Sequence, residues 1–253
     1  MIKYILFDLD DTLLDFQKAE RLALSRTLTE LGIAPEEKIL KRYNELNLAQ
    51  WKRLERGELT LEQVKTERYR LLFGELGIEE SPAKATAIYE KFLGTGHFFI
   101  EGAPELLETL APCYHLYLVS NGTPHVQHSR LASSGIEHYF DGIFISQEIG
   151  YKKPDREFFD WCFARIPGFS GEKAVIVGDS LTSDIQGGKN AGIRTIWFHP
   201  ILEGAHGRTP GEGEQAQILP DATIGSLAEL PDLLKAMDSG GPQMDERDCS
   251  STR

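Results

Sequence analysis

Four aspartates lie within the ten residues FDLDDTLLDF (7–16), directly after an apolar run. Carboxylates this close repel one another unless a nearby positive charge offsets them. Asp8 and Asp10 are two residues apart, so in an extended segment their side chains point to the same side. This spacing indicates that the two acidic groups act on a common ligand.

Polar groups also follow three later apolar segments, at the points where we expect strands to end. They are Ser120, Asn121 and Gly122 after the second predicted strand, Lys153 after the third, and Asp179 and Asp184 after the fourth. In an open parallel sheet, ligands bind beyond the carboxyl ends of the strands. We therefore expect all of these groups to lie near Asp8.

The carboxylates of Asp8, Asp10 and Asp179 would then surround one point. A hard divalent cation with oxygen ligands would keep them ionised, and Mg²⁺ fits this set of donors. A phosphate could approach the same cation. Lys153 would supply positive charge, which a chain with a formal net charge of -12 otherwise lacks.

The end of the second predicted strand offers donors for such a phosphate. The Ser120 hydroxyl and the backbone N–H groups of Asn121 and Gly122 are suited to hold its oxygens. The four segments together predict a site for magnesium and a phosphate ester.

The elements that must position these groups alternate between strands and helices. Short apolar runs with β-branched or aromatic residues predict strands at 3–8, 114–122, 141–146, 173–180 and 193–200. Helical stretches are predicted at 102–111, 123–134, 155–165 and 182–191. Near-continuous apolar strands that alternate with helices predict an α/β fold, a Rossmann-like parallel sheet with helices on both faces.

Residues 16–95 interrupt this alternation with a purely helical pattern. Apolar spacing and glycine stops predict four helices, at 16–31, 35–56, 60–76 and 82–94. The third begins at Thr60 with Gln63 three residues later, the pattern of a capping box. We predict three parts, namely a core of residues 1–15 and 96–237, an inserted four-helix-bundle cap at 16–95, and a flexible C-terminal tail at 238–253.

Composition narrows the class of protein. The chain has 253 residues, of which 41% are hydrophobic and 26% charged, which is typical of a globular protein. Its acidic balance disfavours nucleic-acid binding. The three cysteines are widely spaced and are expected to be reduced thiols: Cys113, Cys162 and Cys249. The first aspartate comes too early for a signal-peptide apolar region, and no run of about 18 apolar residues occurs, so we expect a cytoplasmic protein without membrane contact.

The four motifs together resemble those of the haloacid dehalogenase (HAD) superfamily of phosphohydrolases. The resemblance rests on D-x-D-x-T at 8–12, the hydroxyl residue Ser120, Lys153 before a proline, and G-D-x-x-x-x-D at 178–184. The helical insertion after the first motif resembles the cap of that superfamily. DDTLLDF followed by Glu20, and GDSLTSDIQGG followed by NAG, are similar to the pyrimidine 5′-nucleotidases of the superfamily that clean up modified nucleotides.

The resemblance implies a role for each motif residue. Asp8 would be the nucleophile that forms an aspartyl-phosphate, and Asp10 would protonate the leaving hydroxyl and then activate water. Asp8, the Asp10 backbone carbonyl and Asp179 would hold Mg²⁺. The supporting roles would be bracing of the loop by Thr12, binding of the phosphoryl group by Ser120 and Lys153, and orientation of Lys153 or a metal-bound water by Asp184.

The resemblance implies a magnesium-dependent phosphomonoesterase acting on a small-molecule phosphate ester. We expect a nucleoside 5′-monophosphate phosphatase that favours pyrimidines, as a monomer or homodimer. The alternative within this chemistry is a sugar-phosphate or phosphoglycolate phosphatase, or a phosphomutase. The alternative of a different class is a non-catalytic phosphate-binding protein. Dehalogenase activity is not expected, because the dehalogenases of the superfamily lack the second aspartate that Asp10 supplies.

Several polar and aromatic residues are left outside the predicted site. Asp11 and Asp15 can cap the segment that follows, and Lys152 is expected to be solvated. Aromatic residues at helical spacing are more often core than ligand contacts. Those concerned here are Tyr43, Trp51, His97, Phe98 and Phe99, of which His97 and Phe98 are the better candidates for substrate contact.

Overall fold

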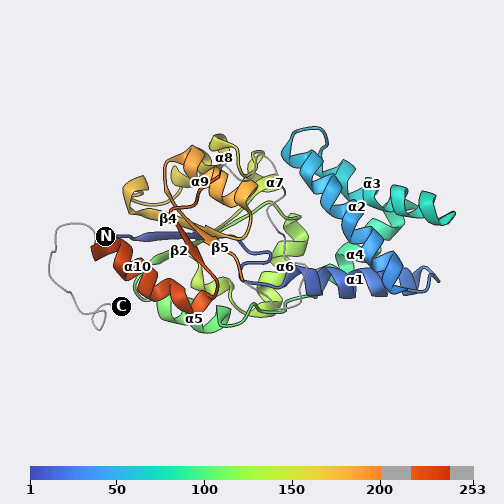
Figure 1. The fold of residues 1–253 in the computed structure, drawn as a ribbon, viewed down its shortest axis with the longest axis horizontal. Coiled ribbons are helices and arrows are strands. Elements are labelled where there is room, and N and C mark those ends of the chain that lie inside the picture. The colour runs from blue at the N-terminus through green and yellow to red at the C-terminus, as the bar shows by residue number, and fades with distance from the viewer. Residues whose placement is uncertain (201–217, 240–253) are drawn as a thin grey trace. The chain divides into compact units, whose positions relative to one another are not determined.

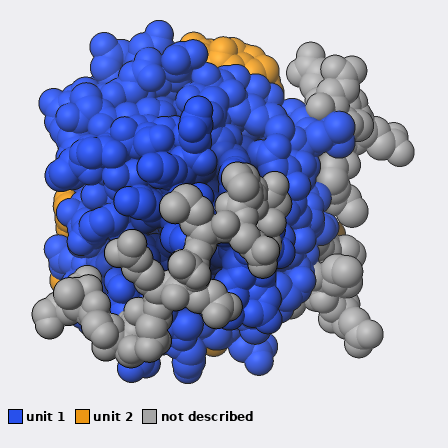
Figure 2. Space-filling view, turned by 90° about the vertical axis from the view of Figure 1, so that its left-hand side faces the viewer, with its two compact units in different colours: residues 1–15, 99–124, 135–253 blue, residues 16–98, 125–134 orange. Residues whose placement is uncertain are grey.

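The structure, a computed structural model, describes residues 1–200 and 218–239. It divides into two compact units. The first contains Met1–Asp15, Phe99–Pro124 and the described residues from Gly135 onward, and the second contains Phe16–Phe98 and His125–Ser134. Figure 1 shows the elements, and Figure 2 colours the two units separately.

The first unit is built on a parallel sheet, whose described strands follow the order β3-β2-β1-β4-β5-β6. They are β1 (Tyr4–Phe7), β2 (His115–Ser120), β3 (Gly142–Ile145), β4 (Ala174–Gly178), β5 (Arg194–Phe198) and β6 (Ala222–Ile224). The five predicted strands are confirmed, each slightly shorter at both ends. Because β1 lies between β2 and β4, the carboxyl ends of these three strands are neighbours at one edge of the sheet.

Helices cover both faces of this sheet. In Figure 1, α8 (Arg156–Phe163) and α9 (Gln186–Ala191) lie on one side of the strands, and α5 (Ala103–Leu110) and α10 (Leu230–Ser239) on the other. Successive strand side chains point to opposite faces, and β1 is buried along its whole length. Tyr4 and Leu6 pack with α8 in one apolar cluster. The predicted fold class is therefore confirmed.

Short helical turns complete the first unit. They are α7 (Ser146–Ile149), η1 (Glu137–Tyr139), η2 (Gly171–Lys173), η5 (Leu227–Glu229) and the π-helical turn η3 (Leu181–Ile185). The helical stretch predicted at 182–191 is present, as η3 followed directly by α9. Strand β6 and helix α10 were not predicted.

The C-terminal boundary also differs from the prediction. Asp238 and Ser239 belong to α10, so the tail predicted at 238–253 begins too early. The Asp238 carboxylate accepts a hydrogen bond from the Ile2 backbone N–H, which ties the end of α10 to the start of the chain. Residues 240–253, including Cys249, lie outside the described residues. Cys162 is a buried free thiol.

The second unit contains the four predicted helices. They are α1 (Phe16–Glu30), α2 (Glu37–Glu55), α3 (Leu61–Leu76) and α4 (Pro82–Leu93). Helix α1 packs against α4, and α3 packs against both α2 and α4. Across the ranges 1–200 and 218–239, no helix is both long enough and apolar enough to span a bilayer.

The helical unit extends beyond the predicted range 16–95. It includes residues 96–98 and nearly all of α6 (Pro124–Ser134), which we had assigned to the core. The Ser129 hydroxyl donates to Gly94 O at 2.8 Å, and Arg130 Nε donates to Gly96 O at 2.7 Å. These long-range contacts give α6 its place, and no local pattern of the sequence reveals them.

The capping box predicted at the start of α3 is confirmed. The Thr60 hydroxyl accepts from the Gln63 N–H at 3.3 Å, and Gln63 Oε1 accepts from the Thr60 N–H at 2.8 Å. Both bonds satisfy backbone N–H groups that a helix start otherwise leaves without partners.

We predict that Thr60→Ala lowers the free energy of unfolding by about 1 kcal/mol, because alanine cannot accept the bond from Gln63. Urea unfolding followed by circular dichroism measures this loss. Thr66→Ala, inside the same helix, is the control and should cost nothing, since alanine is the better helix former. Equal unfolding free energies for the Thr60 variant and the unmodified protein would show that the cap does not stabilise α3.

Candidate active site

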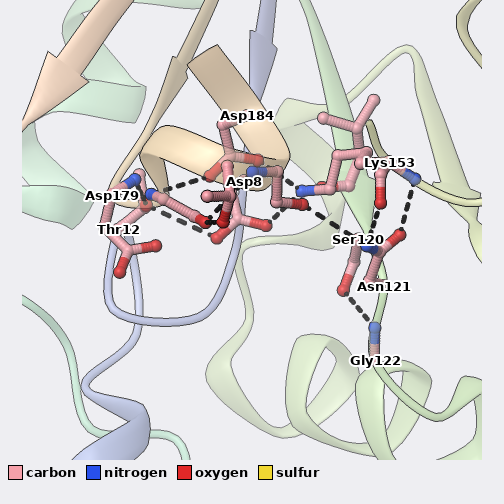
Figure 3. Close-up of polar contacts among 12 residues, drawn as sticks. Asp8, Thr12, Ser120, Asn121, Gly122, Lys153, Asp179 and Asp184 are labelled. Carbon is pink, nitrogen blue, oxygen red and sulfur yellow. Dashed lines mark hydrogen bonds and ion pairs between the residues drawn. The ribbon is translucent and has the colours of Figure 1, made fainter. Parts of the chain in front are cut away.

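The carboxyl ends of β1, β2 and β4 bring the predicted polar groups together (Figure 3). Phe7 is in register with Leu118 of β2 and Val177 of β4, so the three strands end at nearly the same level. Asp8 follows β1 directly, and Asp179 follows β4. The sequence-based prediction that these chain segments converge is correct in its geometry.

Asp8 lies at the centre of this group. It is 7% exposed, its Oδ1 accepts from Lys153 Nζ at 2.6 Å, and its Oδ2 accepts from the Thr12 hydroxyl at 3.4 Å. Burial raises the pKa of Asp8 to about 7, although the Lys153 ammonium acts to lower it. Ionising Asp8 in this buried position therefore costs free energy, and a further cation beside it would favour the ionised form.

Lys153 is enclosed by oxygen acceptors. Its ammonium donates to Asp8 Oδ1, to Asp184 Oδ1 at 2.7 Å and to Val119 O at 2.9 Å, which uses all three of its N–H groups. Burial acts to lower the pKa of Lys153, but the two carboxylates outweigh it and the pKa lies above its ordinary value. The side chain therefore remains charged. As the sequence predicted, Lys153 rather than Lys152 occupies this position.

Asp184 is the second carboxylate that pairs with Lys153. It is 1% exposed, and its second oxygen, Oδ2, accepts from the Ser180 backbone N–H at 3.1 Å. The π-helical turn η3 carries Asp184, and π-helical turns are frequent at functional sites. Asp184 was predicted to orient either Lys153 or a metal-bound water, and the structure shows its contact with Lys153.

Gly178, the last residue of β4, leaves the space that Asp184 fills. A Cβ at this position would overlap the carboxyl carbon of Asp184. A side chain at 178 would therefore displace Asp184 and weaken its bond to Lys153.

We predict that Gly178→Ala lowers turnover of a phosphate ester about 100-fold, the size of loss that a misplacement of about 1 Å can cause. The matched control is Gly171→Ala, where a Cβ would meet its nearest atoms at an ordinary 3.7 Å. Steady-state kinetics of both folded variants tests this. Turnover of the Gly178 variant within twofold of the unmodified protein would mean that the position of Asp184 is not critical.

Three of the carboxylates form a candidate metal centre. Asp8, Asp179 and Asp184 each offer an oxygen, and these oxygens all lie within 4.8 Å of one another. Asp8 and Asp184 share the single ammonium of Lys153, so the three carboxylates together carry an excess of negative charge that a divalent cation would offset. Hard oxygen donors are those that magnesium prefers. The residues present therefore fit the predicted ion. Of the predicted ligands Asp8, Asp10 and Asp179, the cluster contains the carboxylates of Asp8 and Asp179, and Asp184 takes the third place in it.

Thr12 links the first strand end to the fourth. It is fully buried, its hydroxyl donates to Asp8 Oδ2, and the same oxygen accepts from the Asp179 N–H at 3.1 Å. A single hydroxyl thus orients both a carboxylate and a backbone amide. This geometry corresponds to the bracing predicted for Thr12.

Asp10 and Asp11 lie in the tight turn after Asp8. The N–H groups of Leu13 and Leu14 both donate to Leu9 O, at 3.0 and 2.9 Å. Asp11 has a φ of 57°, in the left-handed region that aspartate tolerates better than most residues. The positive φ at position 11 therefore favours an aspartate there over most other residue types. Asp10 is half-buried, and its negative charge is one of the influences that raise the pKa of Asp8.

The segment after β2 differs in detail from the prediction. The Gly122 N–H donates to the Ser120 hydroxyl at 3.0 Å. The Asn121 side chain pairs with the Lys153 backbone, donating to its O at 2.8 Å and accepting from its N–H at 3.0 Å. We had predicted a role only for the backbone of Asn121. Its side chain fixes the loop that carries Lys153.

The aromatic residues of the helical unit lie in different apolar clusters or make different contacts. Tyr43 is fully buried in the apolar core, as predicted. Trp51 packs on a smaller cluster that includes Leu54 and Val64, and Phe98 packs on the main core. His97 Nδ1 lies 3.0 Å from the Ser133 hydroxyl.

Sequence comparisons agree with this arrangement. Residues 5–198 match the family described as haloacid dehalogenase-like hydrolase. The chain is 39% identical over 230 residues to the HAD-hydrolase YfnB of Bacillus subtilis, which covers 91% of this chain and 94% of YfnB. It is 41% identical over 199 residues to the pyrimidine 5′-nucleotidase PynA of Streptococcus pneumoniae, which covers 78% of this chain and 84% of PynA.

Solved structures are similar over nearly the whole length. The crystal structure of YfnB bound to magnesium has a TM-score of 0.84 at 38% identity and covers 92% of this chain and 98% of that one. The L-2-haloacid dehalogenase of Xanthobacter autotrophicus has a TM-score of 0.72 at 22% identity, with 94% and 100% covered. At that identity the likeness concerns the fold alone.

Proposed function

The chain belongs to the haloacid dehalogenase-like hydrolase family, and on that premise we propose that it is a magnesium-dependent phosphomonoesterase working through an aspartyl-phosphate on Asp8. The observation that carries this proposal is the cluster of Asp8, Asp179 and Asp184 at the strand ends, in which Asp8 and Asp184 are paired with the buried Lys153. This group combines a carboxylate nucleophile with the positive charge that phosphoryl transfer needs.

The first half of the reaction belongs to Asp8 and Asp10. A carboxylate oxygen of Asp8 attacks phosphorus, and the bond from phosphorus to the ester oxygen breaks. Asp10 gives its proton to that leaving oxygen, so the alcohol departs uncharged. In the second half, Asp10 takes a proton from water, the water oxygen attacks phosphorus, and the bond to Asp8 breaks. Inorganic phosphate is released and both aspartates return to their starting states.

The other residues hold these groups in place. Lys153 offsets negative charge on the phosphoryl oxygens and keeps Asp8 oriented, while Thr12 fixes the second oxygen of Asp8. Bound magnesium would be held by Asp8, Asp179 and the Asp10 backbone carbonyl, with Asp184 nearby, and would supply positive charge against the phosphoryl oxygens. The Ser120 hydroxyl is proposed to bind the phosphoryl group.

We propose that the substrate is a nucleoside 5′-monophosphate with a pyrimidine base. The 41% identity to the pyrimidine 5′-nucleotidase PynA supports this choice over a sugar phosphate or phosphoglycolate. A cytoplasmic location and a monomeric or homodimeric state stay predictions from the sequence.

Two assays test the proposal in order. Hydrolysis of p-nitrophenyl phosphate is measured with magnesium and with EDTA, and we expect turnover only with magnesium. No turnover by folded protein in either condition would favour a non-catalytic phosphate-binding protein. The values of kcat/KM for UMP, dUMP, dTMP, AMP and phosphoglycolate are then compared. A preference for AMP or phosphoglycolate would remove the pyrimidine assignment and leave the phosphatase assignment intact.

A further inference from the structure

The backbone of Asp179 is held on both sides of its Cα by side chains from other elements. Its N–H donates to the Thr12 hydroxyl at 3.1 Å, and its carbonyl accepts from Trp197 Nε1 at 2.8 Å. The paired register of β4 and β5 ends at Gly178 opposite Trp197, one residue before Asp179. Beyond this point, the indole N–H donates to the carbonyl that follows the strand end.

Trp197 is well suited to this role. It lies on β5, a strand paired on both sides, and its ring stacks on that of His199 with 4.2 Å between centroids and 16° between planes. An indole N–H can only donate, and a half-buried indole needs an acceptor. Its acceptor here is the carbonyl of a candidate metal ligand, so the orientation of the ring and that of Asp179 are linked.

We propose that Trp197 is a positioning residue of the candidate magnesium centre, which acts by fixing the backbone carbonyl of Asp179. This inference rests on the proposed function. Thr12 also contacts Asp8, so changing it would disturb the nucleophile directly. The indole of Trp197 instead donates to the Asp179 backbone, so loss of this bond should act on the metal ligand first. Groups that orient metal ligands typically contribute 10- to 100-fold to metal affinity.

The test is Trp197→Phe, which keeps an aromatic ring beside His199 and removes the N–H donor. Isothermal titration calorimetry of the metal-free protein with magnesium chloride measures the Kd directly. We expect the Kd to rise about tenfold. The magnesium concentration for half-maximal phosphatase rate should rise in parallel, with a smaller fall in kcat at saturating magnesium.

The matched control is Trp161→Phe. Trp161 lies in the same unit, in α8, where it stacks on the Arg165 guanidinium at 3.4 Å and meets Phe144 edge-on. The control should bind magnesium with the unmodified Kd. Thermal unfolding of both metal-free variants shows whether each is folded before titration.

A second measurement needs no substitution at 197 in the titrated protein. With 5-fluorotryptophan incorporated, the three tryptophans give separate ¹⁹F signals, which the Trp→Phe variants assign. The Trp197 signal should shift during a magnesium titration and saturate with the calorimetric Kd, while the Trp161 signal stays unchanged.

The outcomes separate this inference from the function on which it rests. An equal magnesium Kd in Trp197→Phe and the unmodified protein, or a Trp197 signal that stays fixed while magnesium binds, would overturn the role of Trp197 only. Absence of magnesium binding by the unmodified protein would overturn the proposed function itself.

Discussion

Asp8→Asn should lower kcat for phosphate ester hydrolysis by a factor on the order of 10⁴ or more, because the amide cannot form the phosphoryl bond. The variant should still bind inorganic phosphate, since Lys153 and the strand ends remain in place. Asp15→Asn is the control, because Asp15 is an acidic residue of the same segment that we leave outside the site, and it should keep full activity. Substantial residual turnover in Asp8→Asn would exclude the covalent route.

Asp8→Asn should also change how the stability of the protein depends on pH. Because burial raises the pKa of Asp8 from 3.8 to about 7, the folded state binds this proton more tightly than the unfolded state. The associated stability is fully present below about pH 4 and is lost as the pH rises through 7. An uncharged asparagine avoids that loss. Metal-free Asp8→Asn should therefore unfold at pH 8 at a temperature no lower than the unmodified protein, as differential scanning calorimetry can check.

Lys153→Met should be both inactive and unstable. Removing the ammonium leaves the buried carboxylates of Asp8 and Asp184 facing each other without compensation. Breaking a buried ion pair on one side typically lowers the free energy of unfolding by about 3–5 kcal/mol. Turnover should fall at least 100-fold, because the transferring phosphoryl group also loses a cation.

Two comparison variants separate these effects. Lys152→Met changes the neighbouring lysine and should leave the free energy of unfolding and the turnover unchanged. Lys153→Met combined with Asp184→Asn should regain part of the lost stability, because one unpaired carboxylate is gone, but no activity. Normal stability of Lys153→Met in urea unfolding would mean that the three groups are not coupled as their distances indicate.

The strand ends and the cap helices could be predicted because their signals are local. Asp8 and Asp179 each follow a short apolar run, and parallel strands place such positions at one edge. The spacing of Thr60 and Gln63 alone predicts the start of α3. The choice of Lys153 over Lys152 rested on the adjacent proline, and the structure places that lysine among the carboxylates.

Most of the elements and site residues that were not predicted depend on contacts between residues distant in sequence. Helix α6 joins the helical unit through Ser129 and Arg130, which bond to residues more than thirty positions away. Trp197 and the Asn121 side chain act on the backbone of other segments, and backbone acceptors carry no sequence signature. Strand β6 has three residues, too few for a periodicity. Helix α10 did have a readable signal, since Ser226 and Glu229 form a capping box just before it.

Trapping the phosphoryl group on the chain examines the proposed chemistry most directly. Asp10→Asn lacks the base for the second half of the reaction, whereas p-nitrophenol leaves without needing a proton. Mixing this variant with p-nitrophenyl phosphate and magnesium, quenching in acid and analysing peptides by mass spectrometry should therefore find the phosphoryl group on Asp8. A phosphoryl group on another residue, or product formation with an unmodified Asp8 peptide at every time point, would contradict a covalent reaction at this carboxylate.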